Sequence, residues 1–222
     1  GETALLRKIK ECWASLFTER AIYYRQQKGF DHFKVGLAAV VQRMVQSDKS
    51  GIAFSIDPVT NDKRKIVIEA IFGLGEYIVQ GKVTPDHYEI DKNSFVVLDK
   101  QLNYQNLKMV RAGAGNKEVA IGKTEGSLQK LTDEEILKLA LLVRDIEKHY
   151  FFPQDIEWAY LKGRFYIVQS RPITTLGTQN AKGKTQNGEI QIKTGEAILN
   201  GQGASPGIAT GPVKIIQSPK NI

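Results

Sequence analysis

The alternation of apolar and polar positions predicts a helix, a series of short strands, a second helix and a hairpin. Over residues 2–28, apolar side chains recur at helical spacing, which indicates one amphipathic helix. Its apolar stripe comprises Leu5, Ile9, Cys12, Trp13, Leu16 and Phe17, extended by Ala21 and Tyr24. Arg20 and Arg25 lie near the end of this helix, where they would favour the helix dipole or reach a ligand phosphate.

The middle of the chain alternates short apolar runs with turn residues, which predicts a strand-rich region. The apolar runs 35–45 and 50–56 are separated by a polar turn and predict a hairpin. Further strands are predicted near residues 66–72, 86–90, 95–98, 108–110 and 118–121. Thr132 with the three acidic residues after it is a good N-terminal cap, so we expect a helix from this point to about Tyr150.

Residues 154–172 predict a second hairpin, and its strands carry polar groups of particular interest. Asp155 and Glu157 lie on the first strand, and Gln169 and Arg171 lie on the second. Two carboxylates can hold a divalent cation, and the fork of an arginine can hold a phosphate. These residue types therefore indicate a site for Mg²⁺ and a nucleotide. The alternative is a surface hairpin in which Asp155 and Arg171 form an ordinary ion pair.

The length of the loop between these strands decides which side chains share a face. A two-residue turn would pair Leu161 with Arg164 and put Gln169 on the face opposite Glu157. We favour a three-residue loop, because the polar groups then converge. That register pairs Leu161 with Phe165, Glu157 with Gln169, and Asp155 with Arg171. The other face, which we expect to meet a core, comprises Ile156, Trp158, Tyr160, Tyr166 and Val168.

A few further positions are candidates for binding. Glu69 lies in an apolar strand, where a carboxylate needs a partner or a function. Gln42 interrupts another apolar run, and its amide would hydrogen-bond an adenine or ribose or satisfy a neighbouring backbone group. The glycine-bearing turn 73–76 would let backbone N–H groups approach a phosphate, although it matches no complete phosphate-loop motif. The histidines do not have a metal-ligand spacing; they are His32, His87 and His149.

Composition changes this picture little. Of 222 residues, 41% are apolar and 25% are charged, which is ordinary for a soluble globular protein. No apolar run is long enough to span a membrane, the N-terminus lacks a signal-peptide pattern, and the single cysteine, Cys12, suits a reducing cytoplasm. The net charge of +7 comes from basic residues that are mostly mixed with acidic ones, so we do not expect nucleic acid as a partner.

The C-terminal part of the chain predicts a change of domain. Residues 177–198 are polar and rich in Gly, Gln, Asn and Lys, which is typical of a linker. Residues 199–222 would begin a new domain with one strand, because a glycine-rich segment there precedes a short apolar run. We therefore expect one domain over residues 1–176, a linker, and the start of a truncated second domain.

Several ordered motifs resemble the nucleotide-binding domain of the phosphoenolpyruvate synthase (pyruvate, water dikinase) family. They occur in the family's order and cover nearly the whole chain. The segments that carry the resemblance are residues 12–18, 20–21, 24–25, 41–45, 50–60, 69–76, 84–86, 155–158 and 169–172. In addition, residues 203–207 resemble the entry to that family's swivelling phosphohistidine domain.

The resemblance implies an α+β, ATP-grasp-like subdomain with a mostly antiparallel sheet and flanking helices. It implies that Glu157 and Gln169 contact Mg²⁺ bound to ATP, that Arg171 stabilises charge on the transferring group, and that Gln42 contacts the nucleotide. The full enzyme would convert ATP, pyruvate and water to phosphoenolpyruvate, AMP and phosphate through a phosphohistidine. The resemblance assigns no firm role to Glu69, Glu76, Arg20 or Arg25.

The chain also departs from the family's pattern. The N-terminal half of the ATP-grasp domain, the phosphorylated histidine and the pyruvate-binding barrel are expected to lie outside these residues, so pyruvate would bind only elsewhere. We expect the chain to be inactive alone. One alternative is a related ATP-grasp enzyme of the pyruvate, phosphate dikinase or rifampicin phosphotransferase type. A second alternative is a non-catalytic basic binding module.

Overall fold

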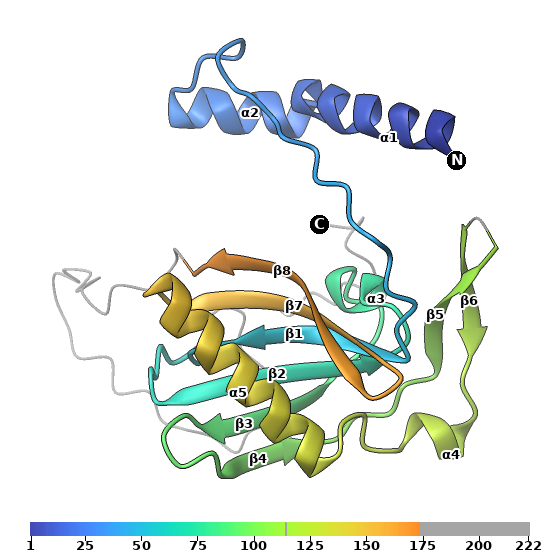
Figure 1. The fold of residues 1–222 in the computed structure, drawn as a ribbon, viewed down its shortest axis with the longest axis vertical. Coiled ribbons are helices and arrows are strands. Elements are labelled where there is room, and N and C mark those ends of the chain that lie inside the picture. Colours follow the sequence, from blue (N-terminus) through green and yellow to red (C-terminus); the bar gives the residue numbers. More distant parts are fainter. Residues whose placement is uncertain (114, 174–222) are drawn as a thin grey trace, which may run out of the picture. The chain divides into compact units, whose positions relative to one another are not determined.

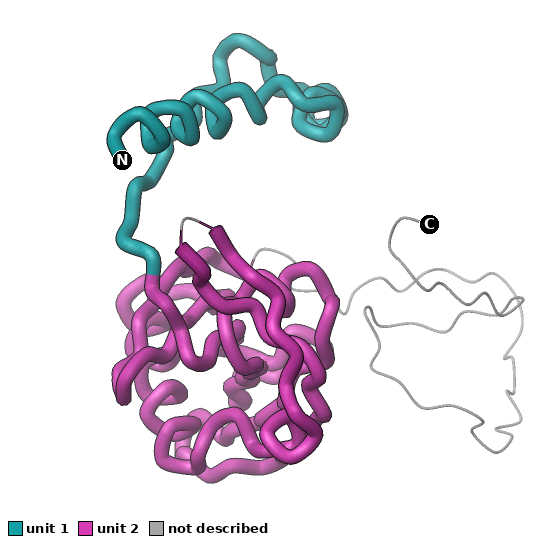
Figure 2. Tube along the Cα trace, turned by 90° about the vertical axis from the view of Figure 1, so that its right-hand side faces the viewer, with its two compact units in different colours: residues 1–44 teal, residues 45–222 magenta. Residues whose placement is uncertain are grey.

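A computed structural model describes residues 1–113 and 115–173, and it divides the chain into two compact units. The first unit comprises residues 1–44 and the second begins at residue 45 (Figure 2). The predicted linker over 177–198 and the predicted strand after it lie outside the described residues. The domain limits predicted from the sequence therefore stay a prediction.

The first unit contains two helices where the sequence predicted one. Helix α1 (Glu2–Ala14) runs into a 3₁₀ turn, η1 (Ser15–Phe17), and helix α2 (Glu19–Lys28) follows. At the break, the Ser15 hydroxyl donates to the Cys12 carbonyl at 2.7 Å and the Thr18 hydroxyl donates to the Ser15 carbonyl at 2.9 Å. Such hydroxyls compete with the helical backbone pattern, and Thr18 is extended, with φ −70° and ψ 152°. The single-helix prediction is therefore wrong.

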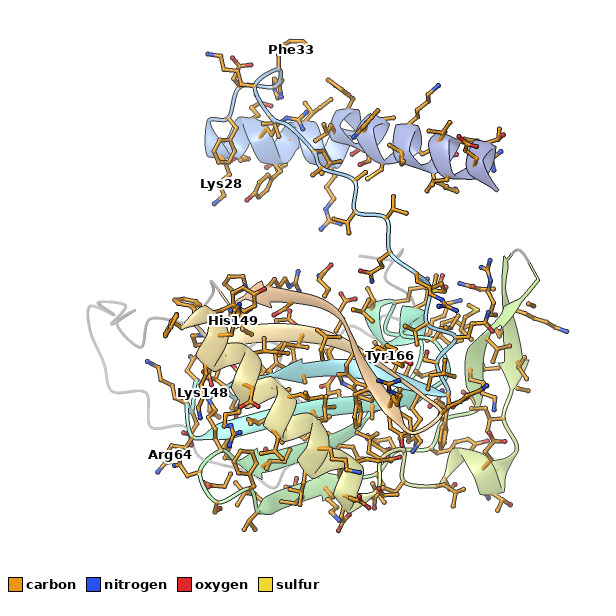
Figure 3. The ribbon with its side chains drawn as sticks, viewed as in Figure 1. Lys28, Phe33, Arg64, Lys148, His149 and Tyr166 are labelled. Carbon is orange, nitrogen blue, oxygen red and sulfur yellow. The ribbon has the colours of Figure 1, made fainter. Side chains whose placement is uncertain are left out.

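The segment after α2 also differs from its prediction. Residues 35–47 form no regular structure, so the predicted strand 35–45 and its hairpin with 50–56 are wrong. A strand needs a neighbour to satisfy its backbone groups, and residues 1–44, all of which are described, contain no strand to pair with. The segment is held locally instead, because the indole N–H of Trp13 donates to the Leu37 carbonyl at 3.1 Å. Phe33, which lies just before this segment, is 89% exposed (Figure 3).

The second unit is built on one six-stranded sheet in which every neighbouring pair is antiparallel (Figure 1). The strand order is β4-β3-β2-β1-β7-β8. The strands are β1 (Lys49–Phe54), β2 (Lys65–Phe72), β3 (Asp86–Asp91), β4 (Val97–Gln101), β7 (Gln154–Leu161) and β8 (Arg164–Pro172). A separate ribbon pairs β5 (Leu107–Ala112) with β6 (Gly115–Ala120), and two short helices are α3 (Glu76–Val79) and α4 (Lys123–Gly126). The predicted α+β class with a mostly antiparallel sheet is confirmed.

Helix α5 (Asp133–Tyr150) lies against one face of this sheet, and the main core lies between them (Figure 1). The capping box predicted at its start is present: the Thr132 hydroxyl accepts from the Glu135 N–H, and the Glu135 carboxylate accepts from the Thr132 N–H. Glu135 also pairs with Lys49 of β1 at 2.7 Å, which ties the helix start to the sheet. The buried helix residues are Ile136, Leu139, Ala140 and Val143, and the sheet contributes Ala53, Ile66, Ile68, Ala70, Tyr88, Ile90, Ile156 and Trp158.

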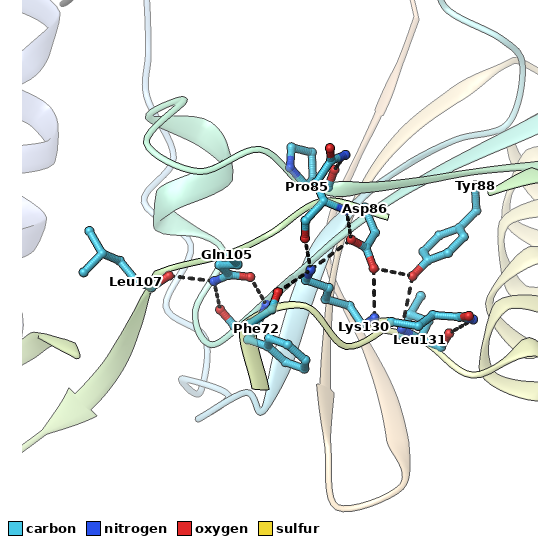
Figure 4. A network of polar contacts seen from close by, with 11 residues as sticks. Phe72, Pro85, Asp86, Tyr88, Gln105, Leu107, Lys130 and Leu131 are labelled. Atoms are coloured by element: carbon cyan, nitrogen blue, oxygen red, sulfur yellow. Dashed lines mark hydrogen bonds and ion pairs between the residues drawn. The ribbon is translucent and has the colours of Figure 1, made fainter. Parts of the chain in front are cut away.

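A buried ion pair connects the sheet to the segment that leads into α5 (Figure 4). The side chains of Asp86 and Lys130 are 0% exposed, and the Lys130 ammonium donates to the Asp86 carboxylate at 2.9 Å. That carboxylate also accepts from the Lys130 N–H at 2.9 Å, the Asn103 N–H at 2.8 Å and the Tyr88 hydroxyl at 2.9 Å. Burial, followed by the charge of Asp86, raises the pKa of Tyr88 well above its usual range, so the hydroxyl remains a donor. Buried charges are tolerated when they are paired with an opposite charge and their remaining polar atoms are hydrogen-bonded, and Asp86 and Lys130 meet both conditions.

Gly51 allows the central strand β1 to fit beside its neighbours. A Cβ at this position would lie 1.9 Å from the backbone oxygen of Glu69 and 2.8 Å from Cζ2 of Trp158. The position therefore requires the absence of a side chain, since neither the β2 backbone nor the buried indole can move freely.

Replacing either charge of the buried pair should destabilise the second unit strongly. Asp86→Asn leaves a buried ammonium without its carboxylate, and we expect a loss of about 3–5 kcal/mol in the free energy of unfolding. The double variant Asp86→Asn/Lys130→Met should lose less than the sum of the single variants. Urea denaturation followed by circular dichroism measures these losses. Lys138→Met removes an exposed pair on α5 and should cost less than about 1 kcal/mol; equal losses for Lys130→Met and Lys138→Met would contradict the assignment.

Gly51→Ala should also destabilise the sheet, because the added methyl group overlaps the backbone of β2. We expect a loss of about 2–3 kcal/mol in the free energy of unfolding, in the range of an overpacked core. Gly115→Ala is the matched control, since a Cβ there meets nothing within 4 Å. The control should stay within about 0.5 kcal/mol of the original protein. A Gly51→Ala protein as stable as the control would show that the strands are less tightly packed.

Candidate functional site

The β7–β8 hairpin brings together the polar side chains that the sequence singled out, but by a different route from the one expected. The loop is a two-residue turn, and Leu161 pairs with Arg164, so the predicted three-residue loop is wrong. Both turn residues have positive φ, 49° at Lys162 and 81° at Gly163, as a type I′ turn requires. Even so, the two pairings that matter are those predicted: Glu157 lies opposite Gln169, and Asp155 lies opposite Arg171.

A β-bulge explains how a two-residue turn gives the pairing that was predicted for a three-residue loop. Trp158 pairs with Ile167, whereas the next pair is Glu157 with Gln169, so Val168 is an extra residue in β8. One extra residue moves every later side chain to the other face of the sheet. Near the turn, Phe165 packs against the core and Tyr166 is 39% exposed, which corrects the prediction that Tyr166 meets the core. Beyond the bulge, Gln169 and Arg171 lie on the face of Glu157 and Asp155.

These side chains belong to the sheet face that α5 does not cover. Ile156 and Trp158 of β7 point to the α5 core, so Asp155 and Glu157 point to the opposite face. Residues that pair directly across antiparallel strands share a face. The registers therefore define two rows across the sheet on this open face. The first row is Gln101, His87, Glu69, Ile52, Glu157 and Gln169, and the second is Asp99, Glu89, Val67, Phe54, Asp155 and Arg171.

The polar contacts at the β8 edge are direct. The Arg171 guanidinium donates to the Asp155 carboxylate through Nε at 2.8 Å and approaches it through Nη2 at 2.7 Å. The Gln169 amide donates to Glu157 at 3.4 Å. The Arg171 side chain is 68% exposed, whereas that of Asp155 is 14% exposed. The Asp155 carboxylate therefore fixes the orientation of a guanidinium that is exposed to solvent. A guanidinium has five N–H donors, and Asp155 uses only part of them.

The partner of Glu69 is His87, which lies opposite it on the neighbouring strand β3. Oε1 of Glu69 lies 3.8 Å from Nδ1 of His87, and Nε2 of His87 lies 3.7 Å from Glu89. The nearby carboxylate of Glu69 raises the pKa of His87 against the opposing effect of burial, and the charge of Glu89 adds to the increase. Glu69 and Glu157 are two strands apart, about 10 Å between their backbones. The sequence therefore located a constrained carboxylate correctly but did not identify its partner.

A groove of about 860 Å³ lies over this part of the open face. Glu69, His87, Glu89 and Gln101 line its floor side by side on β2, β3 and β4, and the loop 57–60 lines it as well. His87 and Gln101 were not predicted from the sequence as residues that line this groove. The signal was present in the alternation over residues 86–91, where polar residues occupy every second position, but only the strand pairing shows that they meet Glu69.

The remaining candidates lie elsewhere. Gln42 is exposed and belongs to the first unit, so its prediction as a nucleotide contact stays a prediction. Glu76 accepts from Gln80 at 3.0 Å and from Asn116 at 3.0 Å, which joins α3 to β6. The turn 73–76 approaches β5, because Gly73, with φ 86°, would place a Cβ 2.4 Å from the Met109 carbonyl. Leu74 donates its N–H to that same carbonyl at 2.8 Å. These contacts give the glycine turn a structural role.

The donor set at the hairpin limits what it can hold. Glu157 and Gln169 offer carboxylate and amide oxygens, which are the ligands that hard cations prefer. Among residues 1–113 and 115–173, no group of three or more His, Cys, Asp and Glu side chains could hold a metal by itself. An ion here would need ligands from a substrate, as Mg²⁺ takes from phosphates.

No helix in the described part of the chain is long and apolar enough to cross a membrane.

Comparison with known proteins shows the family of the chain. Residues 1–191 match the family model described as "Pyruvate phosphate dikinase, AMP/ATP-binding domain". The chain is 44% identical to a probable phosphoenolpyruvate synthase of Methanocaldococcus jannaschii, over 100% of the chain and 18% of that protein. It is 45% identical to the phosphoenolpyruvate synthase of Pyrococcus furiosus, over 97% of the chain and 27% of that protein. A rifampicin phosphotransferase of Bacillus subtilis is 46% identical over 79% of the chain and 20% of its own length.

The match is therefore long relative to this chain and short relative to its relatives. The chain spans less than one third of the length of each of these curated proteins. The family model, by contrast, covers most of the chain, including the first unit, the six-stranded sheet and the polar hairpin. The chain belongs to the pyruvate phosphate dikinase AMP/ATP-binding domain family.

Proposed function

We propose that the open face of the six-stranded sheet forms part of an ATP-grasp site for MgATP. The observation that carries this proposal is the convergence of Glu157, Gln169 and Arg171 on one face, which depends on the bulge at Val168. Glu157 and Gln169 would contact the metal and the nucleotide phosphates. Arg171 would stabilise negative charge on the transferring phosphoryl group. Gln42, from the first unit, would contact the nucleotide near the adenine or ribose.

The residues present suit a magnesium ion that is shared with phosphates. Mg²⁺ is usually bound by one or two carboxylates together with phosphate oxygens and water, so the small donor set at the hairpin is appropriate. When bound, the ion would neutralise charge on the phosphates during phosphoryl transfer. The chain's own contribution is positional: Asp155 orients the Arg171 fork, and the β-pairing keeps Gln169 beside Glu157. Positioning and charge stabilisation are the main needs of phosphoryl transfer.

The whole protein would be a dikinase of the phosphoenolpyruvate synthase type. It would convert ATP, pyruvate and water to phosphoenolpyruvate, AMP and phosphate. Segments outside this chain would contribute the pyruvate-binding domain and the rest of the swivelling phosphohistidine domain that begins at residues 199–222. The similarity to phosphoenolpyruvate synthases over nearly the whole chain supports this proposal. Cys12 is exposed and free, which suits a reducing cytoplasm. We expect the chain alone to have no phosphotransferase activity.

A second candidate is an antibiotic phosphotransferase with the same ATP-binding core. The 46% identity to the rifampicin phosphotransferase favours it, although that match covers a smaller part of the chain. The proposed nucleotide residues serve either enzyme, because ATP is common to both. The acceptor assay on the full-length protein separates them: pyruvate-dependent formation of AMP supports the first, and rifampicin-dependent formation of AMP supports the second.

Substitutions at the hairpin should weaken MgATP binding without unfolding the sheet. In the full-length protein, we expect Glu157→Gln to reduce MgATP affinity by about tenfold or more, since a charged ligand of the metal is lost. Arg171→Lys keeps the charge but removes the planar fork, so it should reduce the rate of AMP formation more than it weakens binding. Isothermal titration and a steady-state assay measure the two effects.

The matched controls are Glu134→Gln and Arg64→Lys, which change exposed residues of the same types outside the open face. Both should leave affinity and rate unchanged. MgATP binding that survives Glu157→Gln and Arg171→Lys intact would refute the assignment of the site.

The Glu69–His87–Glu89 cluster should make stability depend on pH in a defined direction. Because the folded pKa of His87 is raised, its contribution is fully present below the unfolded pKa of about 6.5 and is lost as pH rises through the folded pKa. His87→Gln should therefore lower the free energy of unfolding most at acidic pH and least at alkaline pH. Urea denaturation between pH 5 and 9 checks this difference. In a Glu69→Gln background the pH dependence of the difference should shrink, and a difference that grows with pH would contradict the prediction.

A further inference from the structure

Three consecutive aromatic side chains are exposed at the end of α5. Tyr150 is 57% exposed, Phe151 92% and Phe152 42%, and we call these three residues the aromatic patch. Phe151 is the most exposed large apolar side chain in the described part of the chain. Single exposed apolar residues are common on protein surfaces, whereas contiguous apolar surface usually marks a contact with another segment or molecule.

The backbone of Phe151 is strained. It is the C-cap residue of α5 and has a left-handed conformation, with φ 56° and ψ 21°. Glycine or asparagine usually occupies this position, because a larger side chain crowds the backbone there. A bulky residue with positive φ is an outlier, and such outliers often mark functional positions. At 92% exposure, the ring gains little packing from the described residues to offset this strain.

Hydrogen bonds from Gln154 hold the backbone of the patch in place. The Gln154 side-chain amide donates to the Phe152 carbonyl at 3.0 Å and accepts from the Ser170 hydroxyl at 2.8 Å. Its backbone N–H donates to the Ser55 hydroxyl at 2.8 Å, and the residue is only 1% exposed. The patch is therefore fixed to β7, β8 and the end of β1. A surface that is already ordered loses little conformational freedom when it makes a contact.

The chain continues from a point beside the aromatic patch. Ile173, the last residue that the structure describes, donates its N–H to the Pro153 carbonyl at 2.9 Å. Pro153 directly follows the patch in the sequence. The sequence predicts a linker over residues 177–198, so residues 199–222 follow within a short stretch of chain. A segment tethered at this point meets the patch at a high effective concentration.

The composition of residues 199–222 suits an apolar contact. The segment contains the apolar run 213–216, in which Lys214 is the one charged residue, and it contains no Asp or Glu. A single predicted strand cannot bury its apolar side chains alone. The neighbours of the patch on α5, Lys148 and His149, are also basic, and both are exposed (Figure 3). A symmetric contact between two copies of the patch would bring the Lys148 charges together, which disfavours a second copy as the partner.

We propose that the aromatic patch is a docking surface for residues 199–222 of the same chain, which contact it through the apolar run 213–216. The contact covers the Phe151 ring and removes its apolar surface from water, which offsets the backbone strain at this position. It also places the entry to the next predicted domain beside the end of β8. The proposal does not rest on the proposed contacts of Glu157 and Gln169 with MgATP.

Paramagnetic relaxation in nuclear magnetic resonance tests the proposal on the 222-residue chain. Cys12→Ser removes the single cysteine, which is exposed, and Ser218→Cys then accepts a nitroxide label close to the apolar run. We expect the label to broaden the backbone amide signals of residues 148–152. Because the contact is apolar, the broadening should persist at about 1 M salt, where charges are screened beyond about 3 Å.

Variants of the labelled chain separate docking from mere proximity. Phe151→Gly removes the ring while suiting the left-handed backbone, so the fold should be retained and the broadening at residues 148–152 should fall severalfold. The double variant Ile215→Ser/Ile216→Ser changes the proposed partner segment and should reduce the broadening to the same extent. Phe33→Gly is the matched control, because Phe33 is 89% exposed and lies in the first unit, and it should leave the broadening unchanged.

A mixed sample identifies which chain supplies the partner segment. Nitrogen-15 chains without the nitroxide are combined with labelled chains that carry no nitrogen-15, so that only contacts between chains broaden the observed signals. We expect no broadening in this sample. The proposal is overturned if the broadening appears there, since a second copy then occupies the patch, or if Phe151→Gly and Phe33→Gly leave the same broadening at residues 148–152.

Discussion

The arrangement of the second unit depends on the buried ion pair between Asp86 and Lys130. Asp86 begins β3, and Lys130 lies just before α5, so the pair fixes the position of that helix on the sheet. The carboxylate also accepts backbone N–H groups from residues 103 and 130, which ties the long connection between β4 and α5 to the sheet. Since β7 follows α5 directly, the same pair helps to place the strand that carries Glu157.

The two faces of the sheet have different roles: the face that α5 covers forms the hydrophobic core, and the open face carries the polar side chains of the proposed site. Helix α5 buries the apolar side chains of alternate positions on β1, β2, β3 and β7. The other positions on those strands are left on the open face, where polar residues gather over a groove and at the β8 edge. Gly51 allows the strands to approach closely, and the bulge at Val168 brings Gln169 and Arg171 onto the open face. The proposed nucleotide site therefore follows from packing on the opposite side.

Local sequence patterns predicted most of the second unit because its elements have strong local signals. Short apolar runs between turn residues located β2 and β3, and the Thr132–Glu135 capping box located the start of α5. The predictions failed where a local pattern was overridden. The Ser15 and Thr18 hydroxyls divide the first helix, and the run 35–45 has no partner strand within its unit. Arg25, which a helical pattern assigns to a polar face, is instead buried.

By itself, the sequence determined the residue types of the candidate site, and alternation along each strand determined that Asp155 shares a face with Glu157 and Gln169 with Arg171. The pairing of Glu157 with Gln169 and of Asp155 with Arg171 was predicted from a three-residue loop that the structure does not contain, because alternation alone does not fix how the two strands are aligned. Only the tertiary structure decided how that pairing arises, with a two-residue turn corrected by a bulge, and which face α5 leaves open. It also decided that Glu69 meets His87 and that Asp86 meets Lys130. Those contacts join residues far apart in the chain, and local periodicity contains no information about which distant strands become neighbours.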